Sequence, residues 1–257
     1  MEYLTYKGTI ELYKTFNLKK DFQKSKLATM KDKIRMICMQ VLKEEGINGV
    51  KAYIDDLYKQ TTKRPEGAEL RGELSEILLH CILQDFCDKH KDCCFIKNCC
   101  IPSRTTRTGF TELDLTLCTS KRVYLFESKS YKGKKKLIDE CTLVSDLVTT
   151  DINAQNQVHL SNLNYLIGGC MDLSSAKKQR PYKKCLFTYA DGQITDTRTK
   201  ENKERYPSLD YDNIVEFLER DLASYKEKVW DVQKVYNLVC LFDKYSEQLF
   251  EKHLGGI

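Results

Sequence analysis

The chain lacks the sequence features that define several large classes of protein. It has no apolar run near the ~20 residues that a membrane-spanning helix needs, so we expect no membrane partner. Its first residues, Met-Glu-Tyr-Leu-Thr-Tyr-Lys, do not form a signal-peptide pattern, which favours a cytoplasmic protein. Internal repeats and low-complexity tracts are also missing from the sequence.

An excess of charge of one sign is missing as well. The 42 Lys and Arg residues against 37 Asp and Glu residues give a net charge of +5. This balance is too mild to indicate a nucleic-acid partner, so only local basic clusters can do so. With 41% hydrophobic and 31% charged residues the composition is that of an ordinary soluble protein. The 257 residues suffice for one large domain or for a core with appendages.

Cysteine is plentiful, but the C-x₂-C spacing that marks zinc and iron–sulfur sites is missing. His90, Cys93, Cys94, Cys99 and Cys100 lie close together among the twelve cysteines, so a metal–cysteine site remains the less favoured interpretation. A disulfide framework is not expected in a reducing compartment. We expect these cysteines to be small buried hydrophobic side chains.

Two central segments alternate with the period of two that is typical of β-strands. In residues 111–117, Glu112 and Asp114 share one face and leucines occupy the other. Residues 122–129 are largely apolar on both faces, which predicts a buried strand. The short polar connection at residues 118–121 predicts a hairpin between the two.

The polar residues of these strands predict the chemistry of phosphodiester hydrolysis. Glu127 and Lys129 project from the end of the buried strand, and Asp114 lies on its neighbour. Two carboxylates and a lysine are costly there unless a metal and a substrate pair with them. Carboxylates bind Mg²⁺ or Mn²⁺, which lowers the pKa of a bound water. The alternative is a structural Glu–Lys pair, which the E-x-K motif alone would favour.

A strong helix is expected from about residue 68 to residue 90. Its apolar stripe consists of Leu70, Leu74, Ile77, Leu78 and Cys81. A second stripe consists of Glu69, Glu73, Glu76 and His80. Such a stripe is usually a solvated face, but here the helix precedes the two strands by a short connection. One glutamate could therefore reach the metal, and Gly72 would let the helix approach the strands closely.

Two basic segments lie next to the predicted strands in the sequence. A hydroxyl-rich turn at residues 103–109 contains Arg104 and Arg107. A run at residues 129–136, which follows the second strand directly, contains Lys132, Lys134, Lys135 and Lys136. A lysine run is usually a solvated loop. Because this run begins at the predicted metal site, we expect it to contact a phosphate backbone.

Further elements are expected on both sides of this core. Helices are predicted at residues 32–42, at residues 50–58, at residues 152–166 after an N-cap at Asp151, and as two segments after residue 210. Strands are predicted at residues 98–102 and 184–189, the latter followed by a turn at residues 190–193.

Four motifs in a fixed order resemble those of a known enzyme superfamily. They are Gly72-Glu73 on a helix, Glu112-Leu-Asp114 and Phe126-Glu-Ser-Lys129 on strands, and Asn153-Ala-Gln-Asn-Gln157 on a helix. Together they resemble the PD-(D/E)XK, or restriction-endonuclease-like, nucleases, and most of all the nuclease-related (NERD) group. The resemblance covers residues ~67 to ~195. It implies an α/β fold with a central mixed β-sheet flanked by helices.

We expect the nuclease core to span residues 61–204, between a helical N-terminal extension at 1–60 and C-terminal helices at 205–257, which lie outside the resemblance. The resemblance also implies residue roles. The implied metal ligands are Asp114, Glu127 and Glu73, with Lys129 positioning the attacking water and Gln157 supporting the site or contacting substrate. Glu76 and Gln155 remain alternatives to Glu73 and Gln157.

The expected function is that of a Mg²⁺- or Mn²⁺-dependent (endo)deoxyribonuclease, in the cytoplasm or wherever its nucleic acid lies. DNA is favoured over RNA as the partner, and cleavage of both strands by a single-site fold would need a homodimer. One alternative is a non-catalytic nucleic-acid-binding or assembly protein that retains the fold. Another is an RNA endonuclease of the cap-snatching type, in which His80 would serve as an extra ligand.

Overall fold

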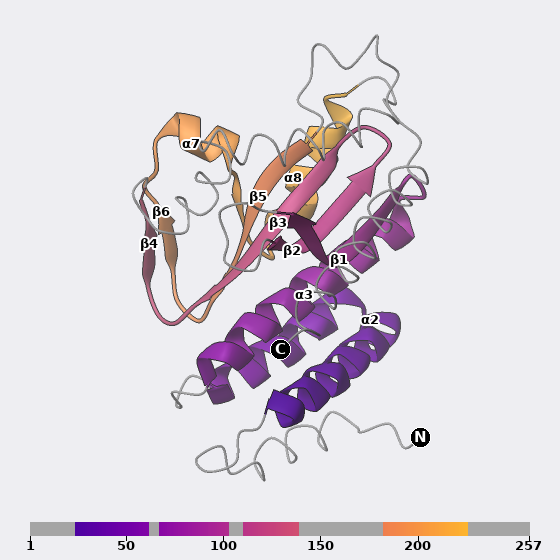
Figure 1. The fold of residues 1–257 in the computed structure, drawn as a ribbon, viewed down its shortest axis with the longest axis vertical. Coiled ribbons are helices and arrows are strands. Elements are labelled where there is room, and N and C mark those ends of the chain that lie inside the picture. The colour runs from indigo at the N-terminus through magenta and orange to yellow at the C-terminus, as the bar shows by residue number, and fades with distance from the viewer. Residues whose placement is uncertain (1–23, 62–66, 103–109, 139–181, 226–257) are drawn as a thin grey trace, which may run out of the picture. The chain divides into compact units, whose positions relative to one another are not determined.

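The structure, a computed structural model, describes residues 24–61, 67–102, 110–138 and 182–225 of the chain. These residues form eleven elements (Figure 1). In chain order they are α2 (Lys24–Thr61), α3 (Gly67–Lys89), β1 (Cys93–Pro102), β2 (Phe110–Thr119), β3 (Val123–Tyr131), β4 (Lys135–Leu137), β5 (Tyr182–Ala190), β6 (Ile194–Asp196), α7 (Lys200–Arg205), β7 (Ser208–Leu209) and α8 (Ile214–Ala223).

Five of the described strands form one mixed sheet. Its strand order is β1-β2-β3-β5-β7, in which β2 pairs antiparallel with both β1 and β3, and β5 pairs parallel with β7. Strands β4 and β6 form a separate two-stranded sheet and lie side by side in Figure 1. The described chain is therefore α/β with a mixed sheet flanked by helices, which confirms the coarse fold class predicted from the sequence. The nuclease core itself stays a prediction.

The chain divides into two compact units. The first unit consists of residues 1–86, 128–135 and 188–193, and the second of residues 87–127, 136–187 and 194–257. Helices α2 and α3 thus group with the ends of β3 and β5, whereas β1, β2 and α8 belong to the second unit. The domain boundaries predicted from the sequence at residues 60 and 204 stay predictions.

The core of the first unit is made by α2 and α3. The predicted apolar stripe of α3 is confirmed, since Leu74 and Leu78 are fully buried and the other members are at most 3% exposed. Helix α2 consists of two helical segments joined at Gly46, whose φ of 73° is a left-handed conformation that glycine adopts at little cost. The two predicted N-terminal helices are therefore the two halves of α2.

Both helices contact the end of β3 within this unit. The Tyr58 hydroxyl on α2 donates to the Tyr131 carbonyl at 2.8 Å, and burial raises the pKa of Tyr58 to about 12. On α3, the hydroxyls of Ser75 and Ser128 lie 2.7 Å apart. These contacts fix the stretch of β3 that follows Glu127.

The core of the second unit lies around the hairpin of β2 and β3. Leu115, Leu117 and residues 123–126 are buried, which confirms the prediction of a strand that is apolar on both faces. The hairpin is confirmed as well, since the Thr119 and Arg122 amides close the turn through hydrogen bonds of 2.9–3.0 Å. Short turns of this kind fix the register between two strands.

The basic run at residues 129–136 contains the end of β3, a turn and the beginning of β4. Strand β3 continues to Tyr131 and β4 already begins at Lys135, with Gly133 at a φ of 69° in the turn between them. A Cβ atom on Gly192 would lie 2.7 Å from the Gly133 carbonyl oxygen, so the two turns approach each other closely. Backbone pairing between distant segments, including the hydrogen bond from the Lys135 amide to the Gln193 carbonyl, holds the beginning of β4 in place.

The remaining predictions have mixed outcomes. Strand β5, the turn after it and α8 are confirmed, and β1 begins earlier than predicted, at Cys93. Elements β6, α7 and β7 were not predicted. The helix predicted at residues 152–166 and the second C-terminal helix lie outside the described residues. No described helix is both long and apolar enough to span a membrane.

Candidate functional site

The two strand carboxylates, Asp114 and Glu127, lie at neighbouring positions of the β2–β3 hairpin. The paired part of the hairpin ends at Leu115 and Phe126, so Asp114 and Glu127 are the residues next to this last pair on the two strands. Carboxylates that lie close together repel each other unless a cation or proton lies between them.

Both carboxylates lie where the hairpin emerges from the core. On β3, residues 123–126 are buried, and from Glu127 to the end of the strand only Ser128 is buried while the others are half-buried. Asp114 is likewise half-buried, next to the buried Leu115. Each of the two carboxylates already takes part in at least one interaction within the folded chain. The local sequence therefore leaves them accessible from solvent yet held by a buried scaffold.

Lys129 follows Glu127 by two residues on β3, the spacing at which a strand returns to the same face. It is half-buried and also engaged in an interaction. Lys129 belongs to the first unit, whereas Glu127 ends a segment of the second. The order Glu-x-Lys thus lies on one continuous strand, as predicted.

Only one of the two carboxylate oxygens of Glu73 on α3 has a partner among the described residues. Its Oε1 forms an ion pair with the ammonium of Lys31 on α2, and the side chain is 12% exposed. Its Oε2 is buried and has no hydrogen-bond partner among the described residues. A buried, unpaired carboxylate oxygen is costly, and ligation of a cation is one way to satisfy it.

The expectation that Gly72 allows a close approach finds no support among the described residues. A Cβ atom at Gly72 would meet nothing within 4 Å. The glycine is therefore not required by packing, and the choice between Glu73 and Glu76 must depend on the carboxylates themselves. Glu76 and His80 are both half-buried on α3, and each takes part in an interaction.

The structure describes some of the residues that we predict to contact phosphate. Lys132, Lys134 and Lys136 are exposed, whereas the Lys135 ammonium lies 5.5 Å from the centre of the Tyr131 ring. The positions outside the described residues are Arg104, Arg107, Gln155 and Gln157. Their predicted roles stay predictions.

The carboxylates of the predicted site are the type of ligand that a hard cation binds. Asp114, Glu127 and Glu73 offer carboxylate oxygens, which Mg²⁺ and Mn²⁺ prefer. Within the described ranges, however, no three His, Cys, Asp or Glu side chains form a group that could hold a metal ion. The three-carboxylate ligand set therefore stays a prediction.

The described cysteines are free thiols, and most are buried. Cys38, Cys81, Cys118 and Cys185 are fully buried, as expected of small hydrophobic side chains. Cys94 lies opposite Cys118 in the β1–β2 register, and a hydrogen bond between their thiols lowers the pKa of Cys94. No metal–cysteine group of three occurs in the described part of the chain.

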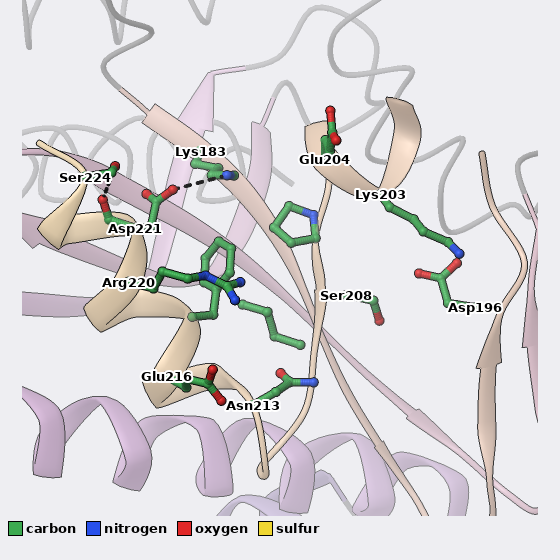
Figure 2. Close-up of a pocket in the computed structure, with 13 residues that line it drawn as sticks. Lys183, Asp196, Lys203, Glu204, Ser208, Asn213, Glu216, Arg220, Asp221 and Ser224 are labelled. Atoms are coloured by element: carbon green, nitrogen blue, oxygen red, sulfur yellow. Dashed lines mark hydrogen bonds and ion pairs between the residues drawn. The ribbon is translucent and has the colours of Figure 1, made fainter. Parts of the chain in front are cut away.

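The second unit also contains a pocket of about 610 Å³ that the sequence did not predict (Figure 2). Residues of β5, β6, α7, β7, α8 and the connections between them line it. They are Lys183, Asp196, Lys203, Glu204, Pro207, Ser208, Leu209, Asn213, Glu216, Phe217, Arg220, Asp221 and Ser224. No motif links these residues, because they come from several separate elements. The one sequence signal among them is the amphipathic pattern of α8.

Comparisons with protein-family models, with curated proteins and with solved structures found no match to this chain. The nuclease resemblance therefore depends on the order and spacing of its motifs. Function has to be argued from the chemistry of the described residues.

Proposed function

We propose that this chain is a divalent-metal-dependent nuclease that hydrolyses DNA phosphodiester bonds. The observation that supports the proposal is the β2–β3 hairpin, whose last pair, Leu115 and Phe126, is followed on the two strands by the half-buried Asp114 and Glu127. Two half-buried carboxylates at such positions are costly without a cation. A cation site for hydrolysis explains why the sequence retains both.

Each residue of the proposed site has a definite task. Asp114, Glu127 and Glu73 would hold Mg²⁺ or Mn²⁺ through carboxylate oxygens. A bound cation of this kind lowers the pKa of water and offsets negative charge on phosphate oxygens. Lys129, two residues after Glu127, would orient the attacking water and counter the charge that develops during attack. Gln157 would support the site or contact the substrate.

The lysines that follow the site would supply affinity rather than chemistry. Lys132, Lys134 and Lys136 are exposed and follow the Glu-x-Lys strand directly. Exposed lysines bind phosphate groups as point charges and release counterions from nucleic acid. They fix the position of the backbone without reading the bases.

A cleavage assay tests the proposed function. Purified protein is incubated with Mn²⁺ and with matched double-stranded DNA, single-stranded DNA and RNA, with and without EDTA. We expect cleavage of DNA that EDTA abolishes. No cleavage of any substrate, together with retained DNA binding, would support the non-catalytic alternative instead. Preferential cleavage of RNA would support the cap-snatching type, and light scattering of the same sample would test the homodimer.

A further inference from the structure

Most of the described cysteines lie in hydrogen-bonded thiol pairs. The three pairs are Cys38 with Cys81, Cys87 with Cys93, and Cys94 with Cys118. All of these side chains are reduced thiols. Two thiols in contact form a disulfide when an oxidant takes up two electrons, so each pair is a candidate redox site.

The backbone register gives Cys94 and Cys118 the separation that a disulfide needs. Cys94 of β1 lies directly opposite Cys118 of β2. The Cα atoms of opposite residues in an antiparallel pair lie about 4.5–5.5 Å apart, within the range of about 4.4–6.8 Å found across disulfides. The two Cβ atoms must approach each other by about 1 Å for the bond to form. Among the described strands β1 pairs with β2 alone, so this edge strand can shift without disturbing a second partner.

Cys94 is the more accessible member of this pair. Its side chain is half-buried, whereas Cys118 is fully buried. The hydrogen bond with Cys118 lowers the pKa of Cys94, against the opposing effect of burial. The thiolate is the form that attacks a disulfide, and a lowered pKa increases its fraction. Cys94 therefore has the properties of an attacking thiol, and Cys118 has the position of a resolving thiol.

The other two pairs do not combine these properties. Cys38 and Cys81 are both fully buried, and their hydrogen bond together with burial raises the pKa of Cys38. The hydrogen bond with Cys93 and burial likewise raise the pKa of Cys87. The Cys93 thiol donates to the His90 carbonyl at 3.0 Å, a bond that only the protonated thiol makes. Both pairs are therefore held as protonated thiols.

We propose that Cys94 and Cys118 form a redox-active dithiol site that exchanges reversibly with low-molecular-weight disulfides. The Cys94 thiolate attacks one sulfur of the small disulfide, whose S–S bond breaks as one thiol leaves. Cys118 then loses its proton and attacks the Cys94 sulfur, which breaks the mixed disulfide and releases the second thiol. Two electrons pass from the protein sulfurs to the small disulfide, and the protons of both protein thiols end on the released thiols.

The resulting bond joins the edge strand to the strand that carries Asp114. Asp114 and Cys118 lie an even number of residues apart on β2, so they share one face of the strand. The bond closes residues 95–117, which include Asp114, into a loop. The proposal does not depend on the nuclease activity, because thiol exchange uses neither the strand carboxylates nor a metal ion.

Peptide mapping of the full chain after incubation with oxidised glutathione in EDTA tests the proposal. Remaining thiols are blocked with N-ethylmaleimide, and trypsin then releases residues 92–97, with Cys93 and Cys94, and residues 108–121, with Cys118 alone. We expect these two peptides to be linked, with the link lost in dithiothreitol and both halves of the glutathione disulfide released as thiols. A chain that retains glutathione on Cys94 and forms no link would overturn the proposal.

Three variants assign the roles of the thiols. Cys118→Ala should stop the reaction at the mixed disulfide, so that glutathione stays on Cys94. Cys94→Ala should slow glutathione addition to Cys118 by at least about tenfold relative to addition at Cys94 in the unaltered chain, because a buried thiol is poorly accessible. Cys93→Ala is the matched control on the same strand and should form the link at a rate within about twofold of the unaltered chain.

The control also identifies the linked residue, because Cys93 and Cys94 share one peptide. Loss of the link in Cys93→Ala would move the bond to Cys93 and overturn the proposal. Thermal unfolding identifies a variant that fails to fold, and Cys94→Ala, at a half-buried position of an edge strand, keeps the test available if Cys118→Ala does so. In urea, where the strand register is lost, several disulfides should form in place of one. An equal yield of this single link in urea would show that the fold does not select the pair.

Discussion

The hydroxyl of Tyr124 on β3 donates a hydrogen bond of 2.7 Å to the carboxylate of Asp221 on α8. Asp221 also accepts from Arg122 at 3.2 Å and from Lys183 at 3.4 Å. The side chains of these three charged residues are only 11%, 14% and 18% exposed, for Arg122, Asp221 and Lys183 respectively. One carboxylate therefore joins α8 to β3 and β5, and burial together with this hydrogen bond raises the pKa of Tyr124.

Asp221→Ala should destabilise the protein by about 3 kcal/mol, because it leaves two partly buried bases without their acid. Tyr124→Phe should cost only about 1 kcal/mol, since it removes a single hydrogen bond. Urea unfolding measures both. Glu219→Ala is the control on the same helix, where the side chain is 56% exposed, and should change stability by less than about 0.5 kcal/mol. Equal losses for Asp221→Ala and Glu219→Ala would show that the cluster does not stabilise the fold.

Asp114→Ala, Glu127→Ala and Lys129→Ala should each lower DNA cleavage by at least about 100-fold. The thermal unfolding temperature should not fall for the two carboxylate variants, because removing one carboxylate from a cluster of like charges without metal relieves repulsion. Glu69→Ala, an exposed carboxylate on α3, is the control and should retain full activity. Any of the three variants that keeps the wild-type rate identifies a structural residue and places the site elsewhere.

Glu73→Gln should weaken Mn²⁺ binding and abolish most cleavage, because a neutral amide is a poor ligand for a hard cation. Glu76→Gln should leave both within a few-fold of the unaltered protein. Lys31→Met separates charge pairing from ligation, since it removes the ion pair but keeps the Glu73 carboxylate. It should strengthen Mn²⁺ binding, measured by calorimetry. Weaker Mn²⁺ binding in Lys31→Met would mean that the ion pair, rather than a cation site, explains the position of Glu73.

Replacing Lys132, Lys134 and Lys136 together by Gln should weaken DNA binding and reduce its dependence on salt. Each lost phosphate contact lowers the slope of log K against log salt by about 0.9, so the change should approach about 2.7. Fluorescence anisotropy, measured at salt concentrations from about 50 to about 200 mM, gives the slope. A control with the same charge change replaces the exposed lysines Lys89, Lys91 and Lys97. An equal change in slope in both variants would show that the run makes no specific backbone contact.

Asp196→Asn should make the free energy of unfolding depend less on pH at acidic pH. Burial acts to raise the pKa of Asp196, but hydrogen bonds from Arg198 outweigh it and lower the pKa below the usual 3.8. A lowered folded-state pKa contributes stability above the unfolded pKa, and this contribution is lost as the pH falls through the folded value. Denaturant unfolding from about pH 5 downward measures the slope. Asp212→Asn, at an exposed aspartate, should leave it unchanged, and a curve for Asp196→Asn that retains the original slope would contradict the prediction.

The sequence by itself determined the elements whose pattern repeats within their own length. The apolar stripe of α3, the buried first half of β3 and the amphipathic α8 could be predicted because burial follows local periodicity. The hairpin also follows from local sequence, since its turn sets the register of the paired residues from Leu115–Phe126 to Cys118–Val123. The placement of Asp114 and Glu127 on neighbouring strands was therefore predictable.

Only the tertiary structure decided the features that join distant parts of the chain. Strands β4, β6 and β7 are two or three residues long, too short for a periodic pattern, and they exist because a partner strand supplies their hydrogen bonds. The ion pair of Glu73 with Lys31, the open space at Gly72 and the pocket below Arg220 likewise depend on three-dimensional packing. Sequence spacing carries no information about such contacts, because the free energy that forms them comes from burial against residues elsewhere in the fold.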